Sequence, residues 1–214
     1  MTAQQDKLAT LFKQATIIPV LTIDRLEDAV PLAKALVAGG VRVLEVTLRT
    51  EVAIPAAKAI MADVPEAIVG IGTILNAADL ARAEALGAKF GISPGATPDL
   101  LKAAAASALP FAPGIATASE LMQALAHGFD LVKFFPAESA GGIKALRALA
   151  GPFPELRFCP TGGIGEANAA AWLSEPNVVA VGGSWLCPAA DIRSANWAGI
   201  SAICRRTLNS LNPA

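Results

Sequence analysis

The feature that most constrains the fold is a repeat of short apolar segments, each followed by an alanine-rich helical segment. The apolar segments recur roughly every 20 to 26 residues, the spacing of repeated βα units. Eight such units predict a closed parallel barrel, a (β/α)8 TIM barrel, with a doubly wound open sheet as the alternative. The expected strands are 17–21, 42–46, 68–71, 89–92, 110–112, 131–134, 157–159 and 178–181.

Residues that begin and end helices punctuate the segments between these strands. Asp24 can cap a helix over 26–37 that stops at Gly39 and Gly40. An extra N-terminal helix over about residues 5–14 precedes the first strand, and another over 197–211 ends the chain. Because no linker divides the sequence, we expect a single domain over residues 1–214. Further N-cap signals are Asn76, Thr97 before Pro98, and Thr117 three residues before Glu120.

Composition excludes several classes of protein. The 214 residues are 54% hydrophobic and 16% charged, with a formal net charge of -1 and no basic run, so we expect no nucleic-acid partner. Polar residues, glycine or proline interrupt every apolar run before about 18 residues, so we expect no membrane span. Residues 1–7 lack the basic start and apolar core of a signal peptide, and we expect a cytoplasmic protein.

The metal-binding and redox residues are few. Cys159, Cys187 and Cys204 are widely spaced and odd in number, which is typical of reduced core thiols. The one histidine, His127, is expected near a helix end, before Gly128. Without a CxxC motif or a second histidine we expect no transition-metal centre and no cofactor, although a magnesium site built from carboxylates stays open.

Lys133 is the most informative single residue, because it lies inside the apolar segment 129–136. Burying an ammonium group is costly unless it is paired or loses its proton, and burial lowers the pKa of a lysine side chain. A neutral amine in an apolar pocket is a nucleophile for carbonyl carbons. The alternative is a lysine at a sheet edge whose ammonium group reaches water.

Polar residues gather where the predicted strands end, which is where active sites of parallel barrels lie. Glu45 follows Val41 and Val43 with period two, so all three should face the interior, and Lys133 shares its parity with Leu131 and Phe135. The other polar or conformationally special positions at strand ends are Arg49, Thr73, Pro94 and Thr161. The alternatives are a surface ion pair between Glu45 and Arg49, and helix capping by the two threonines.

Two glycine pairs follow the last two strands: Gly162-Gly163 and Gly182-Gly183, the second followed by Ser184. In parallel barrels this is the position of a recurrent phosphate site. Glycine lets backbone N–H groups approach an anion, and a helix expected to begin at Ser184 would add a favourable dipole. The alternative is that the glycines only make tight turns. A nucleophilic lysine, a carboxylate, an arginine and a phosphate site together predict Schiff-base chemistry on a phosphorylated 2-oxo acid.

Five motifs, in register from about residue 18 to residue 186, closely resemble those of the bacterial 2-keto-3-deoxy-6-phosphogluconate aldolases. They are Glu45-Val46-Thr47-Leu48-Arg49-Thr50, Ile92-Ser93-Pro94-Gly95, Lys133-Phe134-Phe135-Pro136-Ala137-Glu138, Phe158-Cys159-Pro160-Thr161-Gly162-Gly163-Ile164 and Gly182-Gly183-Ser184-Trp185-Leu186. One departure is Ile71, where the family often has alanine. The terminal helices match least well.

The resemblance implies a homotrimeric class I aldolase of the Entner–Doudoroff pathway. Such an enzyme yields pyruvate and glyceraldehyde 3-phosphate and usually has side activity on 4-hydroxy-2-oxoglutarate. The resemblance assigns the Schiff base to Lys133, proton transfer to Glu45, and the substrate carboxylate to Arg49 and Thr73. The remaining implied residues are Pro94, Phe135 and Thr161 in the pocket and Gly162, Gly163, Gly183 and Ser184 at the phosphate.

Two other functions stay open from the sequence. One is a phosphosugar epimerase or synthase on the same barrel, because a fold alone does not decide a reaction. The other is a non-catalytic phosphosugar-binding protein, which would need the glycine pairs but no buried lysine beside Glu45. The gluconate or galactonate configuration of the preferred substrate is also open.

Overall fold

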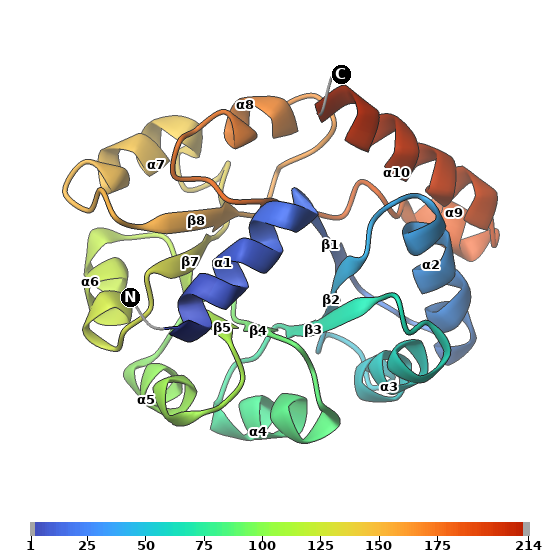
Figure 1. The fold of residues 1–214 in the computed structure, drawn as a ribbon, viewed down its shortest axis with the longest axis horizontal. Helices are drawn as coiled ribbons and strands as arrows, with labels where there is room; N and C mark the ends of the chain where they lie inside the picture. The colour runs from blue at the N-terminus through green and yellow to red at the C-terminus, as the bar shows by residue number, and fades with distance from the viewer. Residues whose placement is uncertain (1–2, 212–214) are drawn as a thin grey trace.

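The computed structural model describes residues 3–211 and contains a barrel of parallel strands surrounded by helices (Figure 1). The strands are β1 (Ile17–Leu21), β2 (Val43–Thr47), β3 (Ile68–Gly72), β4 (Gly91–Ile92), β5 (Phe111–Ala112), β6 (Gly114–Ile115), β7 (Leu131–Phe134), β8 (Arg157–Pro160) and β9 (Val181–Gly183).

The strand pairing closes the barrel. One ladder runs in the order β5-β4-β3-β2-β1-β9 and a second in the order β6-β7-β8, with all pairs parallel. Only Pro113 separates β5 from β6, so the fifth predicted strand, 110–112, continues beyond its predicted end as β6. Bridges from Phe158 to Val178 and from Thr161 to Gly182 join β8 to the segment that carries β9. The predicted (β/α)8 barrel is therefore confirmed, and an open doubly wound sheet is wrong.

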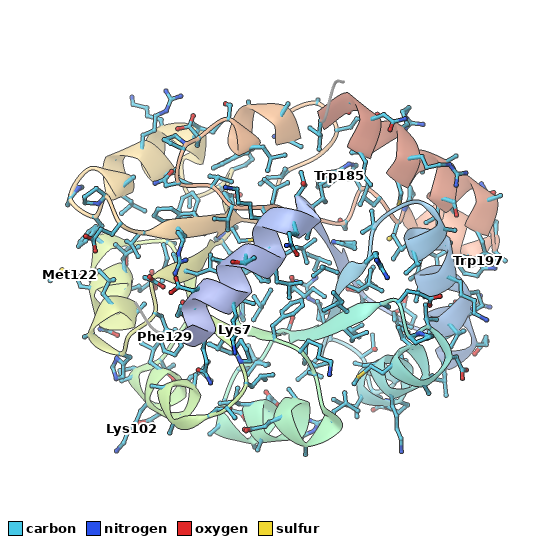
Figure 2. The ribbon with its side chains drawn as sticks, viewed as in Figure 1. Lys7, Lys102, Met122, Phe129, Trp185 and Trp197 are labelled. Carbon is cyan, nitrogen blue, oxygen red and sulfur yellow. The ribbon has the colours of Figure 1, made fainter. Side chains whose placement is uncertain are left out.

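The helices form the outer layer. They are α1 (Ala3–Ala15), α2 (Leu26–Ala38), α3 (Ala53–Asp63), α4 (Ala77–Leu86), α5 (Pro98–Ala106), α6 (Ala118–Ala126), α7 (Gly142–Ala150), α8 (Ala169–Leu173), α9 (Ala189–Arg193) and α10 (Trp197–Leu211). Small alanines on the buried faces of these helices pack against the outer side chains of the strands. Polar and flexible side chains such as Lys102 point away from the barrel (Figure 2). Within residues 3–211 the helices are all too short or too polar to cross a membrane.

A separate inner core fills the barrel and meets α1 at one end. Ile18, Val43, Ile92 and Leu131 belong to this inner core, together with Leu8, Ala9 and Phe12 of α1. Apolar residues of α1 face the strands while its other side faces solvent, and the helix lies across the ring of strands in Figure 1. The extra N-terminal helix that the sequence predicts is thus present and closes one end of the barrel.

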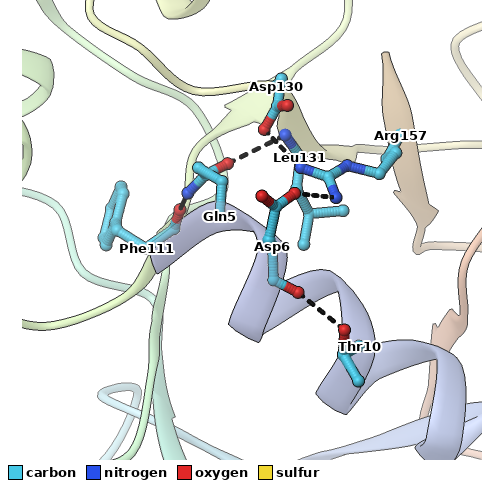
Figure 3. Close-up of polar contacts among 7 residues, drawn as sticks. All are labelled: Gln5, Asp6, Thr10, Phe111, Asp130, Leu131 and Arg157. Carbon is cyan, nitrogen blue, oxygen red and sulfur yellow. Dashed lines mark hydrogen bonds and ion pairs between the residues drawn. The ribbon is translucent and has the colours of Figure 1, made fainter. Parts of the chain in front are cut away.

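Polar contacts fix α1 to the amino ends of the strands (Figure 3). Gln5, which is 2% exposed, donates through Nε2 to the carbonyl oxygen of Phe111 at 2.8 Å and accepts from the N–H of Leu131 at 2.9 Å. Arg157 bridges Asp6 at 3.0 Å and Asp130 at 2.7 Å. Since a buried polar group must find partners, these contacts specify where α1 docks. The opposite, carboxyl end of the barrel is left for the site.

Some boundary predictions are wrong. Asp24 is no cap: α2 begins after Arg25, which has no capping side chain and instead binds Asp28 with two contacts of 2.8 Å. The last strand lies at Val181–Gly183, later than predicted, because pairing with β1 extends the strand into residues that would otherwise favour a turn. Val41 precedes β2 and packs with the outer core, so it does not share the inward face of Val43.

Other local predictions are confirmed. Asn76 accepts from the N–H of Asp79 at 2.9 Å, and Thr97 from that of Leu100 at 3.2 Å. Thr117 and Glu120 form the predicted capping box of α6. His127 is the C-cap residue of α6, so it lies at a helix end as expected. The three cysteines are buried and free.

Candidate active site

A buried ion pair crosses the barrel interior between β2 and β7. The Nζ atom of Lys133 lies 3.2 Å from Oε1 of Glu45, and the two residues are 4% and 1% exposed. Period-two alternation along each strand directs both side chains inward, as the sequence predicts. Gly72 at the end of β3 leaves room for the carboxylate, since a Cβ there would lie 2.6 Å from Cγ of Glu45.

This geometry removes two of the alternative readings. Lys133 is not an edge lysine reaching water, because its ammonium group is inside the barrel. Glu45 does not pair with Arg49, because its carboxylate contacts Lys133. A buried ion pair is weak support for stability, because removing two charges from water is costly, but such pairs are frequent at functional sites.

Apart from Glu45, the neighbours of Lys133 in the ring contact and in the strand register are uncharged. Its Nζ atom lies 5.3 Å from the centroid of the Phe135 ring, and its strand neighbours in register are Gly114 and Cys159. Complete burial raises the pKa of the Cys159 thiol to about 12. Because the thiolate and not the thiol is the nucleophile, Cys159 does not compete with the lysine at neutral pH.

A pocket of about 250 Å³ opens at the carboxyl ends of the strands, above the ion pair. Phe135 belongs to the pocket and also lies beside Lys133, so it connects the two. Seven of the eleven residues expected at the site line this pocket: Arg49, Phe135, Thr161, Gly162, Gly163, Gly183 and Ser184. Lys133 and Glu45 are buried, and Thr73 and Pro94 lie at neighbouring strand ends, outside its lining.

Arg49 presents an exposed guanidinium to this pocket. Within residues 3–211 the guanidinium has no hydrogen bond to a side chain or a carbonyl group and no ion pair. Its loop is nevertheless fixed, because Thr47 donates to the carbonyl of Leu21 at 2.8 Å and Thr50 to that of Ile23 at 2.6 Å. A free guanidinium on a fixed loop is suited to bind a carboxylate by two hydrogen bonds.

Thr73 and Pro94 occupy constrained positions at the ends of β3 and β4. Thr73 has a φ of 59°, an uncommon conformation for a β-branched residue. The hydroxyl of Ser93 accepts from the N–H of Gly114 at 3.1 Å, and a Cβ at Gly114 would collide with Pro94. Neither Thr73 nor Thr161 caps a helix, since the caps of α4 and α8 are Asn76 and Asn168.

The loop after β8 has the conformation that only glycine adopts readily. Gly162 and Gly163 have φ values of 102° and 77°. The N–H of Gly162 faces Gly182, the bridge partner of Thr161, whereas within the described residues the N–H groups of Gly163 and Ile164 have no hydrogen-bond partner. Successive unpaired N–H groups can form a concave nest of the kind that binds anions, which is the geometry that the phosphate prediction requires.

The second glycine pair differs from the prediction at its last residue. Gly183 ends β9 and packs against Trp185, and Ser184 is exposed at the pocket. No helix begins at Ser184: α9 starts at Ala189 and has only five residues. The expected helix dipole at Ser184 is therefore wrong, because residues 185–188 separate Ser184 from the helix.

The sequence reasoning missed three lining residues: Val20, Thr22 and Ile164. Thr22 directly follows β1, so the rule applied to the other strand ends would have found it. Val20 and Ile164 carry no polar signal and could not be distinguished from core residues.

Comparisons with known proteins agree with this geometry. The family model described as KDPG and KHG aldolase matches residues 8–203. The chain is 54% identical over 192 residues to the KHG/KDPG aldolase of Escherichia coli K12, covering 90% of each protein. It is 50% identical over 198 residues to the 2-dehydro-3-deoxy-phosphogluconate aldolase of Pseudoalteromonas atlantica, covering 92% of each.

A crystal structure of the KDPG aldolase of Legionella pneumophila is also similar, with a TM-score of 0.91 and 47% identity over 93% of this chain and 97% of that one. That structure contains pyruvate captured as a covalent carbinolamine intermediate. With a family match over nearly the whole barrel, the chain belongs to the KDPG and KHG aldolase family.

Proposed function

We propose that this protein is a class I aldolase that cleaves 2-dehydro-3-deoxy-6-phosphogluconate into pyruvate and glyceraldehyde 3-phosphate. The observation that carries the proposal is the lysine buried in the barrel beside a carboxylate and beside Phe135, which lines an open pocket. The carbinolamine in the similar Legionella aldolase is an amine adduct of a ketone, which is the first intermediate of this chemistry. We also propose side activity on 4-hydroxy-2-oxoglutarate, as the name of the E. coli relative implies.

In this mechanism the uncharged amine of Lys133 attacks the C2 carbonyl carbon and forms a carbinolamine. Loss of water gives an iminium ion. The proton of the C4 hydroxyl leaves to a base, the C3–C4 bond breaks, and its electron pair moves into an enamine as the aldehyde departs. The enamine takes a proton at C3, and water releases pyruvate and free lysine. Glu45 is the base and then the acid in these proton transfers, since it contacts the amine directly.

The other residues bind the two charged ends of the substrate. Arg49 and Thr73 bind the carboxylate, and Phe135, Thr161 and Pro94 form the pocket between. The phosphate is bound by the N–H groups of Gly162 and Gly163, and by Gly183 and Ser184. The support is that unpaired N–H groups of the glycine loop and the unpaired guanidinium of Arg49 line the same pocket.

Borohydride reduction in the presence of pyruvate tests the imine. We expect a stable pyruvate adduct on the peptide that contains Lys133, and none on the exposed Lys89, Lys102 or Lys144. Lys133→Arg should be inactive although it keeps the charge, because a guanidinium stays protonated and is a poor nucleophile. An adduct at another lysine, or none, would refute the mechanism.

The same preparation separates the rival functions. A metal-dependent epimerase or synthase would lose activity on chelation, whereas imine chemistry should survive it. Turnover of the aldol substrate excludes a purely binding role. Comparing gluconate- and galactonate-configured substrates assigns the stereochemical preference.

We further propose that residues 1–214 form a single domain, that the protein assembles as a homotrimer and that it is cytoplasmic. The trimer rests on the resemblance to the aldolase family, and the single domain on the absence of a linker in the sequence. Light scattering coupled to gel filtration measures the mass of the assembly, and a single cooperative unfolding transition is expected.

A further inference from the structure

Glu138, just beyond the lysine strand, contacts the glycine loop that follows β8. The N–H of Ala137 donates to the carbonyl of Thr161 at 2.8 Å, and the N–H of Glu138 to that of Gly162 at 3.0 Å. The segment after β7 is therefore paired to the loop after β8 by backbone hydrogen bonds. A Cβ at Gly163 would lie 2.6 Å from Cβ of Glu138, so the loop and the Glu138 side chain are packed closely together.

The carboxylate of Glu138 holds a second contact to the same loop. Its Oε1 accepts from Nδ2 of Asn168 at 3.0 Å and from the indole N–H of Trp172 at 2.8 Å. Asn168 also donates to the carbonyl of Gly163 at 3.1 Å and accepts from the N–H of Gly165 at 2.8 Å. Because Trp172 is fully buried, it anchors this cluster to the core.

These contacts fix the direction of the N–H groups that are left free. In a trans peptide the C=O and the following N–H point in opposite directions. The carbonyls of Thr161, Gly162 and Gly163 are taken by Ala137, Glu138 and Asn168. The N–H groups of all three following residues must then point the other way: that of Gly162 faces Gly182, and those of Gly163 and Ile164 have no partner within the described residues.

We propose that Glu138 and Asn168 are positioning residues for phosphate recognition. Asn168 turns the carbonyl of Gly163 away from the ligand, and Glu138 holds Asn168 between the loop and Trp172. This inference rests on the proposed assignment of the substrate phosphate to the glycine loop. Neither side chain touches the reacting atoms.

The contribution of Glu138 is an acceptor oxygen and not a charge. Within residues 3–211 it forms no ion pair, and a negative charge beside a bound phosphate would be unfavourable. One oxygen, Oε1, makes both side-chain contacts, and the amide oxygen of glutamine can make the same two. Glu138→Gln should therefore retain the function that Glu138→Ala loses.

The experiment compares KM for 2-dehydro-3-deoxy-6-phosphogluconate with KM for unphosphorylated 4-hydroxy-2-oxoglutarate. For Asn168→Ala and Glu138→Ala we expect a rise of about tenfold or more on the phosphorylated substrate, which corresponds to about 1.4 kcal/mol. In both variants, KM for the unphosphorylated substrate should change by less than about twofold. Glu138→Gln should behave like wild type on both.

A control variant separates positioning from general loosening of the loop. Glu166→Ala breaks an exposed ion pair to Arg206 in the same β8–α8 connection and should leave both KM values unchanged. Three outcomes would each overturn the proposal. They are an equal rise of KM on both substrates, a rise of KM in Glu166→Ala equal to that in Asn168→Ala, and an unchanged KM in Asn168→Ala. If Gly163→Val discriminates between the substrates but Asn168→Ala does not, only this inference fails. If neither does, the phosphate assignment itself fails.

Discussion

A single methyl group at Gly72 should disable proton transfer without replacing either Lys133 or Glu45. A Cβ at this position would contact Oε1 of Glu45 and lie 2.6 Å from its Cγ and 2.7 Å from its Cδ. The backbone of Gly72 is not in the left-handed region, so alanine fits the strand itself. Because three atoms of the buried carboxylate side chain are too close, Gly72→Ala must move Glu45 away from Lys133.

The magnitude follows from the geometry of the pair. At an effective dielectric constant of about 20, unit charges attract by about 5 kcal/mol at the observed 3.2 Å and by about 3 kcal/mol at about 5 Å. We therefore expect Gly72→Ala to lower the free energy of unfolding by about 2 kcal/mol on this account. Losing a positioned acid/base group should slow proton transfer by about 10²- to 10⁴-fold.

The assay is exchange of the pyruvate methyl protons with deuterated water, followed by NMR, beside borohydride trapping and urea unfolding. Gly72→Ala and Glu45→Gln should both still trap pyruvate on Lys133 but exchange its protons far more slowly than wild type. Gly95→Ala is the matched control, because a Cβ there meets nothing within 4 Å. Exchange by folded Gly72→Ala within about twofold of wild type would refute the role of Glu45, given the losses typical of acid/base groups.

Three further variants test other parts of the site. Gly163→Val forces a branched side chain into a φ of 77°. It should raise KM for the phosphorylated substrate at least about tenfold and leave KM for 4-hydroxy-2-oxoglutarate almost unchanged. Gly165→Ala is the control, because a Cβ there meets open space. Arg49→Ala should weaken pyruvate capture by about 10- to 100-fold, the loss expected for a charge-assisted hydrogen bond, and an unchanged half-saturation concentration for trapping would contradict this. Burial raises the pKa of the Cys159 thiol to about 12 from the 9.0 of a free thiol, so above pH 9 the unfolded chain loses a proton that the folded chain keeps. Wild-type stability in urea should then fall by about 1.4 kcal/mol more per pH unit than that of Cys159→Ala between about pH 9 and 11, and parallel slopes would argue against the shift.

The sequence predicts the inward placement of Lys133 and Glu45 because strand periodicity is a local signal. Lys133 lies on the same face of its strand as Leu131 and Phe135. This period of two places its side chain inside once a closed barrel is assumed. That Glu45 contacts it depends on Gly72, whose missing side chain leaves the space; no local pattern carries this information.

Errors in the prediction arise where contacts between nearby side chains override the preference of a single residue. Asp24 has a good capping side chain, and α2 begins at Leu26 as predicted, but the residue at its N-cap is Arg25, whose side chain contacts Asp28 twice. Ser184 follows two glycines as a cap often does, yet the chain continues through Trp185, which packs over Gly183, before a short helix begins. Neither contact can be derived from the type of the capping residue alone.

The position of α1 has a kinetic consequence. Since this helix and the inner core fill the amino end of the barrel, substrate, water and both products must share one entrance at the carboxyl end. Glyceraldehyde 3-phosphate, bound at the glycine loops, would stand between the enamine and that entrance. We therefore expect ordered release, with the aldehyde leaving first and pyruvate last. Pyruvate should then be a competitive product inhibitor, whereas the aldehyde should give a mixed pattern.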